Sequence, residues 1–89
     1  MNLILEERGK KMGNYEKYLN VFMEIFEISE EKAKTLEYQD IEQWDSVGHM
    51  GLIAEIEDTF DIMMDTDDII DFNSFTKGME LLKKYDIVF

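Results

Sequence analysis

Apolar residues recur at three- and four-residue spacing between Tyr15 and Phe26, which is the period of an α-helix with one buried stripe. After Ile28, Ser29 can cap one short helical turn. The segment from there to Asp45 shows scattered apolar residues without a sustained period, so we predict a long loop that is pinned at a few points. The pinning residues are Leu36, Tyr38, Ile41 and Trp44.

A second helix is expected to begin at Asp45 or Ser46, because either side chain can accept hydrogen bonds from the amides of a first helical turn. Helical spacing of apolar residues continues from there to about Thr59 or Phe60. The residues of this helix that we expect to face a core are Val47, Met50, Ile53, Ala54, Ile56 and Phe60.

Two further helices are predicted in the last third of the chain. Asp65 or Thr66 can cap a short helix that runs through Asp71, and Asn73 or Ser74 can cap another. No stretch shows the alternation that is typical of a strand. The predicted fold class is therefore all-α, with three main helices, one short helix and a long loop between the first two main helices. The apolar residues of the last two helices are Ile69, Ile70, Phe75, Met79 and Leu82.

A chain of 89 residues holds one domain, and it is too short to build a deep catalytic cavity beside its core. We interpret residues 14–89 as that domain and the slightly basic residues 1–13 as an N-terminal extension, with Met12 as an alternative start. The chain contains no cysteine, which excludes disulfides and thiolate metal sites. No signal peptide or membrane span is recognisable, so we expect a cytoplasmic protein. A monomer is the simplest expectation for so charged a small domain.

Negative charge is concentrated in the middle of the chain. The formal net charge is -12, and no Lys or Arg occurs between Thr35 and Thr76. Such a surface repels nucleic acid and anionic lipid and attracts proteins with basic patches, although acidity also serves solubility alone. The twelve acidic residues of this segment are Glu37, Asp40, Glu42, Asp45, Glu55, Glu57, Asp58, Asp61, Asp65, Asp67, Asp68 and Asp71.

The sequence WDSVGHM at residues 44–50, followed by LIAEIEDTF at residues 52–60, resembles the phosphopantetheine attachment region of acyl carrier proteins. In that family an Asp-Ser pair followed by an apolar residue opens the second helix, and an acidic stretch near the end of that helix precedes an aromatic residue. The resemblance extends from about Tyr15 to Leu82, because the predicted helices and the long loop follow the order of the family. It implies an acyl-carrier-like bundle.

The resemblance implies a carrier without catalytic activity of its own. Ser46 would receive 4'-phosphopantetheine from coenzyme A through a phosphopantetheinyl transferase and magnesium, and Asp45 would help orient that transferase. Acyl-loading and acyl-transferring enzymes with basic docking patches would then use the thiol as a thioester carrier. The residues expected to dock these partners are Val47, Met50, Glu55, Glu57 and Asp58. The residues expected to line an acyl pocket are Ile56, Phe60, Phe72, Phe75 and Met79.

Other functions of the same residues have less support. A hydrolase with His49 as the base for Ser46 lacks an evident third partner, and we interpret His49 as an exposed helix residue near the docking surface. No metal site is expected, because the aspartates starting at Asp61 or Asp65 do not fit a calcium loop, with its glycine at position six and carboxylate at position twelve.

The finer assignment stays open. Gly48, His49 and Gly51 stand where carriers of bulk fatty-acid synthesis often have polar or acidic residues, which favours a carrier for a dedicated pathway, such as one for a specialised lipid or a polyketide. An aminoacyl or peptidyl carrier shares the serine and the fold and is the close alternative. A helical module that binds basic proteins and is never modified is the alternative from another class.

Overall fold

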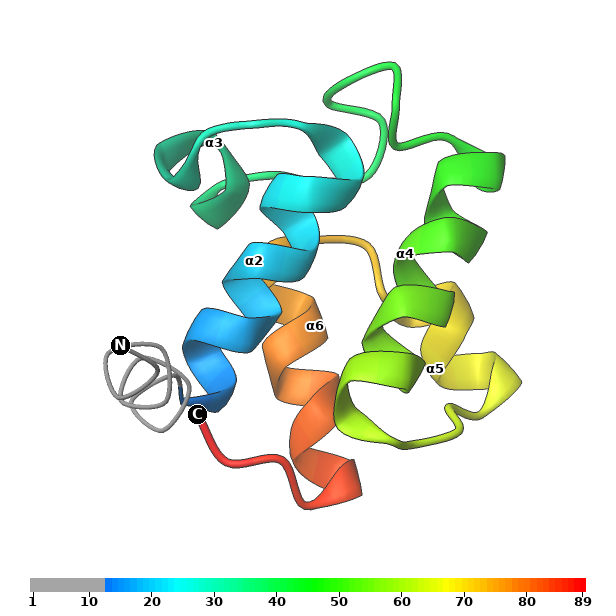
Figure 1. Ribbon diagram of the computed structural model, residues 1–89. Coiled ribbons are helices and arrows are strands. Elements are labelled where there is room, and N and C mark those ends of the chain that lie inside the picture. Colours follow the sequence, from blue (N-terminus) through cyan, green and yellow to red (C-terminus); the bar gives the residue numbers. More distant parts are fainter. Residues whose placement is uncertain (1–12) are drawn as a thin grey trace, which may run out of the picture.

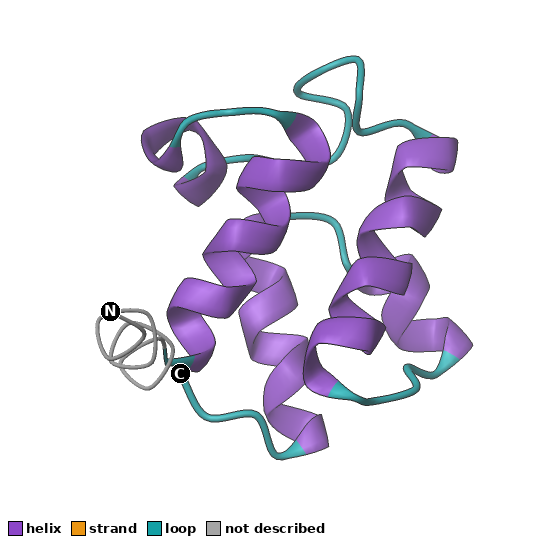
Figure 2. Ribbon diagram, viewed as in Figure 1, coloured by secondary structure: helices purple, strands orange, loops and turns teal. Residues whose placement is uncertain are grey.

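The computed structural model describes residues 13–89, and within this range it consists of helices and loops without a β-strand (Figures 1 and 2). The predicted all-α class is thereby confirmed. The helices follow the predicted order, and the segment before the second main helix contains a helix of five residues where one turn was expected. The elements are α2 (Asn14–Phe26), α3 (Glu30–Lys34), α4 (Ser46–Phe60), α5 (Thr66–Asp71), α6 (Phe75–Leu82) and a 3-10 turn, η1 (Lys83–Tyr85).

Three helices begin at a side chain that accepts a hydrogen bond from the first turn, as the capping residues predicted. Asp45 caps α4, Ser29 caps α3 and Ser74 caps α6. The helices α2 and α4 both end at a residue in the left-handed conformation, Glu27 and Asp61, each with φ of 55°. This geometry turns the chain sharply without a glycine.

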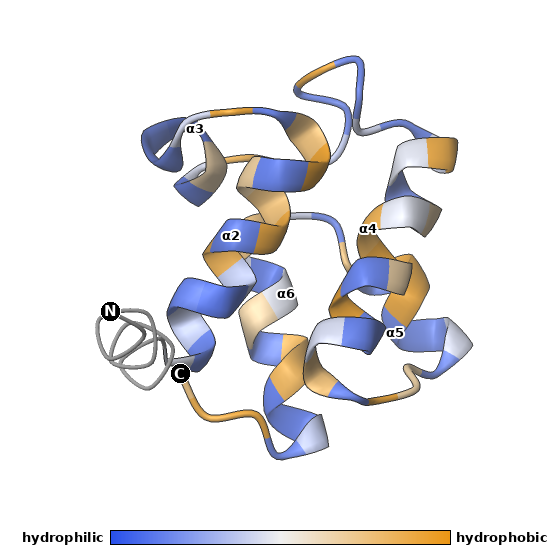
Figure 3. Cartoon of the chain, viewed as in Figure 1, coloured by the Kyte–Doolittle hydropathy of each residue, from blue (hydrophilic) through white to orange (hydrophobic). Residues whose placement is uncertain are grey.

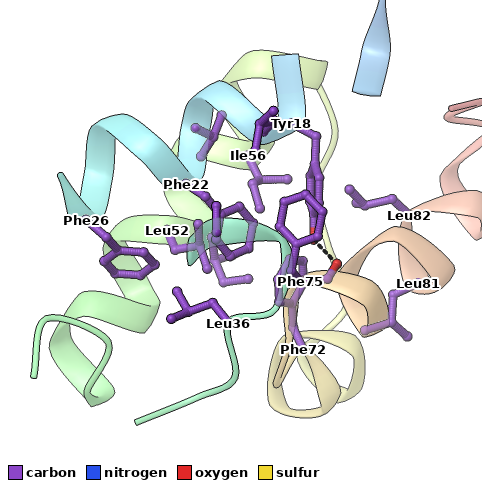
Figure 4. Close-up of a cluster of buried hydrophobic side chains, with 14 of the residues drawn as sticks. Tyr18, Phe22, Phe26, Leu36, Leu52, Ile56, Phe72, Phe75, Leu81 and Leu82 are labelled. Atoms are coloured by element: carbon purple, nitrogen blue, oxygen red, sulfur yellow. Dashed lines mark hydrogen bonds between the residues drawn. The ribbon is translucent and has the colours of Figure 1, made fainter. Parts of the chain in front are cut away.

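Aromatic side chains fill the space between α2, α4 and α6 (Figure 4). Tyr18 is fully buried, and its hydroxyl donates a hydrogen bond of 2.7 Å to the carbonyl oxygen of Phe75. Burial raises the pKa of Tyr18 well above its usual value. This bond satisfies a polar group inside the core and joins the first main helix to the last. The largest fully buried side chains are Trp44, Tyr18, Phe22, Phe26, Phe72, Phe75, Leu36, Leu52, Ile53, Ile56 and Leu82.

The core face of α4 differs from the prediction at its first turns. Val47 is 78% exposed, Met50 is 56% exposed, and Ala54 is exposed as well. Val47, Met50 and Ala54 follow one another at three- and four-residue spacing and form one stripe of the helix, and α4 turns a different stripe to the core. Trp44, from the loop, is fully buried and stacks on Phe26 at a centroid distance of 5.4 Å. The buried residues of α4 are Leu52, Ile53 and Ile56.

The long segment before α4 is attached to the connection between α5 and α6. The amide of Tyr38 donates to the carbonyl oxygen of Asn73 over 2.9 Å, and the amide of Phe75 donates to that of Leu36 over 3.0 Å. Leu36 is buried, which confirms it as a pinning residue. These bonds bring the loop beside the end of α5, and so determine which loop residues lie near the start of α4.

The chain ends against the bundle. The segment after η1 is hydrophobic (Figure 3), Ile87 is buried, and the ring of Phe89 lies 5.4 Å from that of Tyr18. The side-chain amide of Asn14 donates to the carbonyl oxygen of Val88 over 3.0 Å, so this end lies beside the start of α2. The proposed extension, residues 1–13, lies outside the described residues except for the residue that precedes α2. No described helix is long and apolar enough to cross a membrane.

Candidate functional site

Ser46 is the first residue of α4, and its side chain is exposed. The preceding residue, Asp45, has extended backbone geometry, and its Oδ1 accepts a hydrogen bond of 2.8 Å from the amide of Gly48. The first amides of a helix lack intrahelical acceptors, and the helix dipole adds partial positive charge there. The hydroxyl of Ser46 therefore stands in a position where an attached anionic group is electrostatically favoured.

Gly48 allows the loop to lie directly against the first turn of α4. A β-carbon at this position would overlap the backbone carbonyl oxygen of Gln43. The side-chain amide of Gln43 in turn donates to the carbonyl oxygen of Phe26 over 3.1 Å, which ties the loop to the end of α2. At Gly51, one turn further along α4, a β-carbon would meet only open space. Packing against the loop therefore requires a glycine at position 48, whereas it does not require one at position 51.

His49 joins the loop, α4 and α5. Its Nδ1 lies 3.0 Å from Nε1 of Trp44, and its Nε2 lies 2.7 Å from the carbonyl oxygen of Ile69. The indole N–H can only donate, so Nδ1 is the acceptor and Nε2 carries the proton that is donated to Ile69. His49 is therefore neutral in this arrangement, and neither ring nitrogen is left for Ser46.

The interpretation of His49 as an exposed helix residue is wrong, because the ring is half-buried and is nearly parallel to the Trp44 ring at a centroid distance of 6.1 Å. One of its two partners is a backbone carbonyl on another helix, which no side-chain pattern reveals. The one available signal was that the single tryptophan and the single histidine of the chain flank a helix start, five positions apart.

A pocket of about 370 Å³ opens beside Ser46. Its walls come from α4, α5 and the loop, and they are mainly apolar, with Met50, Ile70 and Phe72 among the lining residues. Tyr38 adds an aromatic ring on the loop side. The structure thus places a small apolar space next to the one exposed serine hydroxyl that opens α4.

The five residues predicted to line an acyl pocket do not come together at this place. Phe72 lines the pocket beside Ser46, whereas Ile56 and Phe75 are buried in the core. Phe60 packs on the edge of the core, and Met79 lines a separate hollow of about 300 Å³ next to Phe89. The prediction missed Tyr38 and the two isoleucines of α5, because only the folded loop brings them beside α4.

The short helix α5, which forms one wall of the pocket, is fixed on another side by Asp68. This carboxylate is 3% exposed, and it accepts hydrogen bonds from Nζ of Lys84 over 2.7 Å and from the hydroxyl of Tyr85 over 2.6 Å. These two hydrogen bonds lower the pKa of Asp68, and the bond from Lys84 has the larger effect. Burial of the carboxylate opposes this change. Asp68 likewise raises the pKa of Lys84, and burial followed by the bond to Asp68 raises that of Tyr85.

The predicted docking residues lie along α4. Val47, Met50, Glu55 and Asp58 are exposed, and Glu57 is half-buried because its Oε2 accepts a hydrogen bond of 2.9 Å from the amide of Met64. In the described part of the chain no group of three or more acidic, histidine or cysteine side chains is placed to hold a metal ion. Four of these five residues are thus available to a partner, while Glu57 also stabilises the turn between α4 and α5.

Comparisons with protein-family models, with curated proteins and with solved structures returned no match to this chain. The function is therefore argued from the site itself. That site combines an exposed hydroxyl at a helix start, a neighbouring apolar pocket and exposed acidic side chains further along the same helix.

Proposed function

We propose that this chain is an acyl carrier protein that bears 4'-phosphopantetheine on Ser46 and carries acyl intermediates as thioesters for a dedicated biosynthetic pathway. The observation that carries the proposal is the position of Ser46, which is exposed as the first residue of α4 and lies beside an apolar pocket of about 370 Å³. The helix order, with a long segment before α4 and a short α5, is the order expected for an acyl-carrier-like bundle.

The start of α4 suits a phosphodiester for reasons of charge. The segment from Thr35 to Thr76 has no Lys or Arg, so the chain offers no cation near Ser46 along this segment. The favourable potential would come from the amides and the dipole of α4. Any further positive charge needed while the group is being transferred would come from the transferase and its magnesium ion.

The attachment is a substitution at phosphorus. The Oγ of Ser46 attacks the β-phosphorus of the coenzyme A pyrophosphate and forms a new P–O bond, while the bond to adenosine 3',5'-bisphosphate breaks. The serine proton passes to a base of the transferase. Ser46 needs no base of its own, which agrees with the engagement of both His49 nitrogens elsewhere. Once attached, the arm supplies a thiol that can hold an acyl group as a thioester.

Partner enzymes would recognise the exposed side of α4. Val47 and Met50 offer an apolar contact next to Ser46, and Glu55 and Asp58 offer negative charge further along the helix. Such a surface fits an enzyme with a basic patch around an apolar centre, since complementary charge accelerates encounter and fixes orientation. The apolar lining of the pocket favours an acyl cargo over an aminoacyl or peptidyl one.

The proposal is tested by the intact mass of the protein after incubation with coenzyme A, magnesium and a broad-specificity phosphopantetheinyl transferase. We expect a gain of one phosphopantetheinyl group in the wild type and none in Ser46→Ala. The matched control is Ser29→Ala, which removes another exposed serine at a helix start and is expected to be modified as the wild type is. No gain in the folded wild type would instead favour the unmodified interaction module.

A further inference from the structure

His49 is half-buried, although it lies one turn after the exposed Ser46. Its ring lies between the indole of Trp44 and the last turn of α5, where it reaches the carbonyl oxygen of Ile69. That carbonyl oxygen also accepts from the amide of Phe72 over 3.4 Å at the end of α5, so His49 is a second donor to it. One side chain thus connects the loop before Ser46 with the helix that follows α4.

The bond between Trp44 and His49 exists only while the imidazole is neutral. Trp44 is fully buried, and its N–H needs an acceptor, which is Nδ1 of His49. A protonated imidazole carries a hydrogen on both nitrogens and can only donate. The N–H of Trp44 would then face the new N–H at Nδ1, and this hydrogen bond would be lost. The bond to Ile69 would persist and gain strength from the charge.

The surroundings of His49 contain few other groups that titrate. Its ring lies 5.7 Å from the ring of Tyr38 and 6.2 Å from that of Phe72. On its own helix the carboxylate of Asp45 is bound to an amide, and on α5 the carboxylate of Asp68 is paired with Lys84. The remaining residues around the pocket, Ser46, Met50, Ile69, Ile70, Phe72 and Asn73, are uncharged.

We infer that His49 is a proton-sensitive latch, which holds the loop before Ser46 against α4 when neutral and releases Trp44 when protonated. The part of the loop freed by protonation is the stretch around Trp44, because Tyr38 stays bound to Asn73 through its backbone amide. The helix α5 stays bound to His49 through Ile69. Tyr38 lines the pocket beside Ser46 and its ring lies 6.1 Å from that of Trp44, so release of Trp44 would loosen the loop side of that pocket. The latch is a property of the folded chain, and its effect on a bound acyl group rests on the proposed function.

The chain offers an internal comparison between the loop and α5. The amide of Gln39 donates to the carbonyl oxygen of Trp44 over 3.1 Å, so its hydrogen exchange reports on the loop. The amide of Ile69 donates to the carbonyl oxygen of Asp65 over 3.0 Å, so its hydrogen exchange reports on α5. The indole N–H gives one further signal, because the chain contains a single tryptophan.

The test is a titration of the unmodified, isotope-labelled protein by NMR from about pH 8 to pH 5, the range in which histidine side chains change charge. We expect the Trp44 indole signal to shift with the midpoint of the His49 ring. After correction for the intrinsic exchange rate, the equilibrium constant for opening of the Gln39 amide should rise roughly fivefold, which corresponds to the loss of one hydrogen bond. The equilibrium constant for opening of the Ile69 amide should not rise.

The matched variant is His49→Gln, whose amide can accept from Trp44 and donate to Ile69 but does not titrate. In this variant neither the Trp44 indole signal nor the opening of Gln39 should change with pH. A His49 ring that titrates while the Trp44 indole and Gln39 stay constant would overturn the latch, as would an equal response in His49→Gln. If this variant does not fold, the comparison of Gln39 with Ile69 in the wild type decides. Modification of Ser46 is not involved, so failure here leaves the carrier proposal to its own test.

Discussion

Gly48 lies so close to the carbonyl oxygen of Gln43 that a β-carbon would overlap it. We predict that Gly48→Ala destabilises the protein by about 1–3 kcal/mol, because the cost of the forced displacement exceeds the helix propensity that alanine adds. Gly51→Ala, in open space on the same helix, should instead stabilise by up to about 1 kcal/mol. Urea unfolding followed by Trp44 fluorescence measures both. Equal stability of the two variants would contradict this packing.

Asp45 has a structural role that can be separated from its charge. Removing the cap in Asp45→Ala should lower the free energy of unfolding by about 1 kcal/mol, whereas Asp45→Asn keeps an acceptor for the Gly48 amide and should retain most of the stability. Thermal unfolding followed by circular dichroism distinguishes the two. If the transferase uses the carboxylate itself, Asp45→Asn should be modified more slowly than the wild type despite its stability. Equal destabilisation by both changes would argue against the cap.

The hydroxyl of Tyr18 is expected to matter for stability more than any exposed one. Tyr18→Phe removes this hydrogen bond to the carbonyl of Phe75, which should cost about 0.5–1.5 kcal/mol. Tyr38→Phe serves as the control, because Tyr38 is exposed and should change stability by less than about 0.5 kcal/mol. Urea unfolding of the three proteins gives the comparison. A tolerated Tyr18→Phe would mean that water or another donor reaches the carbonyl.

The Asp68 cluster predicts an acid-sensitive contribution to stability. The pKa of Asp68 is lower in the folded protein than its ordinary value, so folding is favoured by the ionised form. This contribution is present in full above the ordinary value of about 4 and is lost as the pH falls through the lower folded value. Asp68→Asn should therefore be less stable than the wild type at neutral pH, with a difference that shrinks in acid.

The control for this effect is Asp67→Asn, which removes an exposed carboxylate from the same helix. It should leave the unfolding midpoint nearly unchanged at neutral pH. Thermal midpoints of the three proteins between about pH 7 and pH 3 test the prediction. A difference between the wild type and Asp68→Asn that stays constant across this range would show that the charge of Asp68 is not responsible.

The helix boundaries followed from local chemistry, which explains why they were predictable. The start of α4 at Ser46 and that of α6 at Phe75 depend on capping side chains within three residues of the amides they bind. The position of Ser46 at an exposed helix start depends on the same local signal. The predicted start and end of α4 are therefore confirmed.

The lining of the site depended on contacts between distant segments and was not predictable in the same way. Val47 was expected in the core as an apolar residue near the helix period, but it lies with Met50 and Ala54 on the exposed stripe of α4. Tyr38 reaches the pocket because its amide bonds to Asn73, a pairing of backbone groups that leaves no trace in the side-chain pattern. His49 was misjudged for the same reason, since its acceptor is the carbonyl of Ile69.

The most direct test of the central claim is the fragment spectrum of the tryptic peptide of residues 35–77, taken after reaction with coenzyme A and a phosphopantetheinyl transferase. This peptide contains both Ser46 and Ser74, so fragmentation distinguishes the start of α4 from that of α6. We predict one phosphopantetheinyl group, on Ser46. Modification of Ser74 in its place, or an unmodified peptide from protein that is helical by circular dichroism, would contradict the assignment.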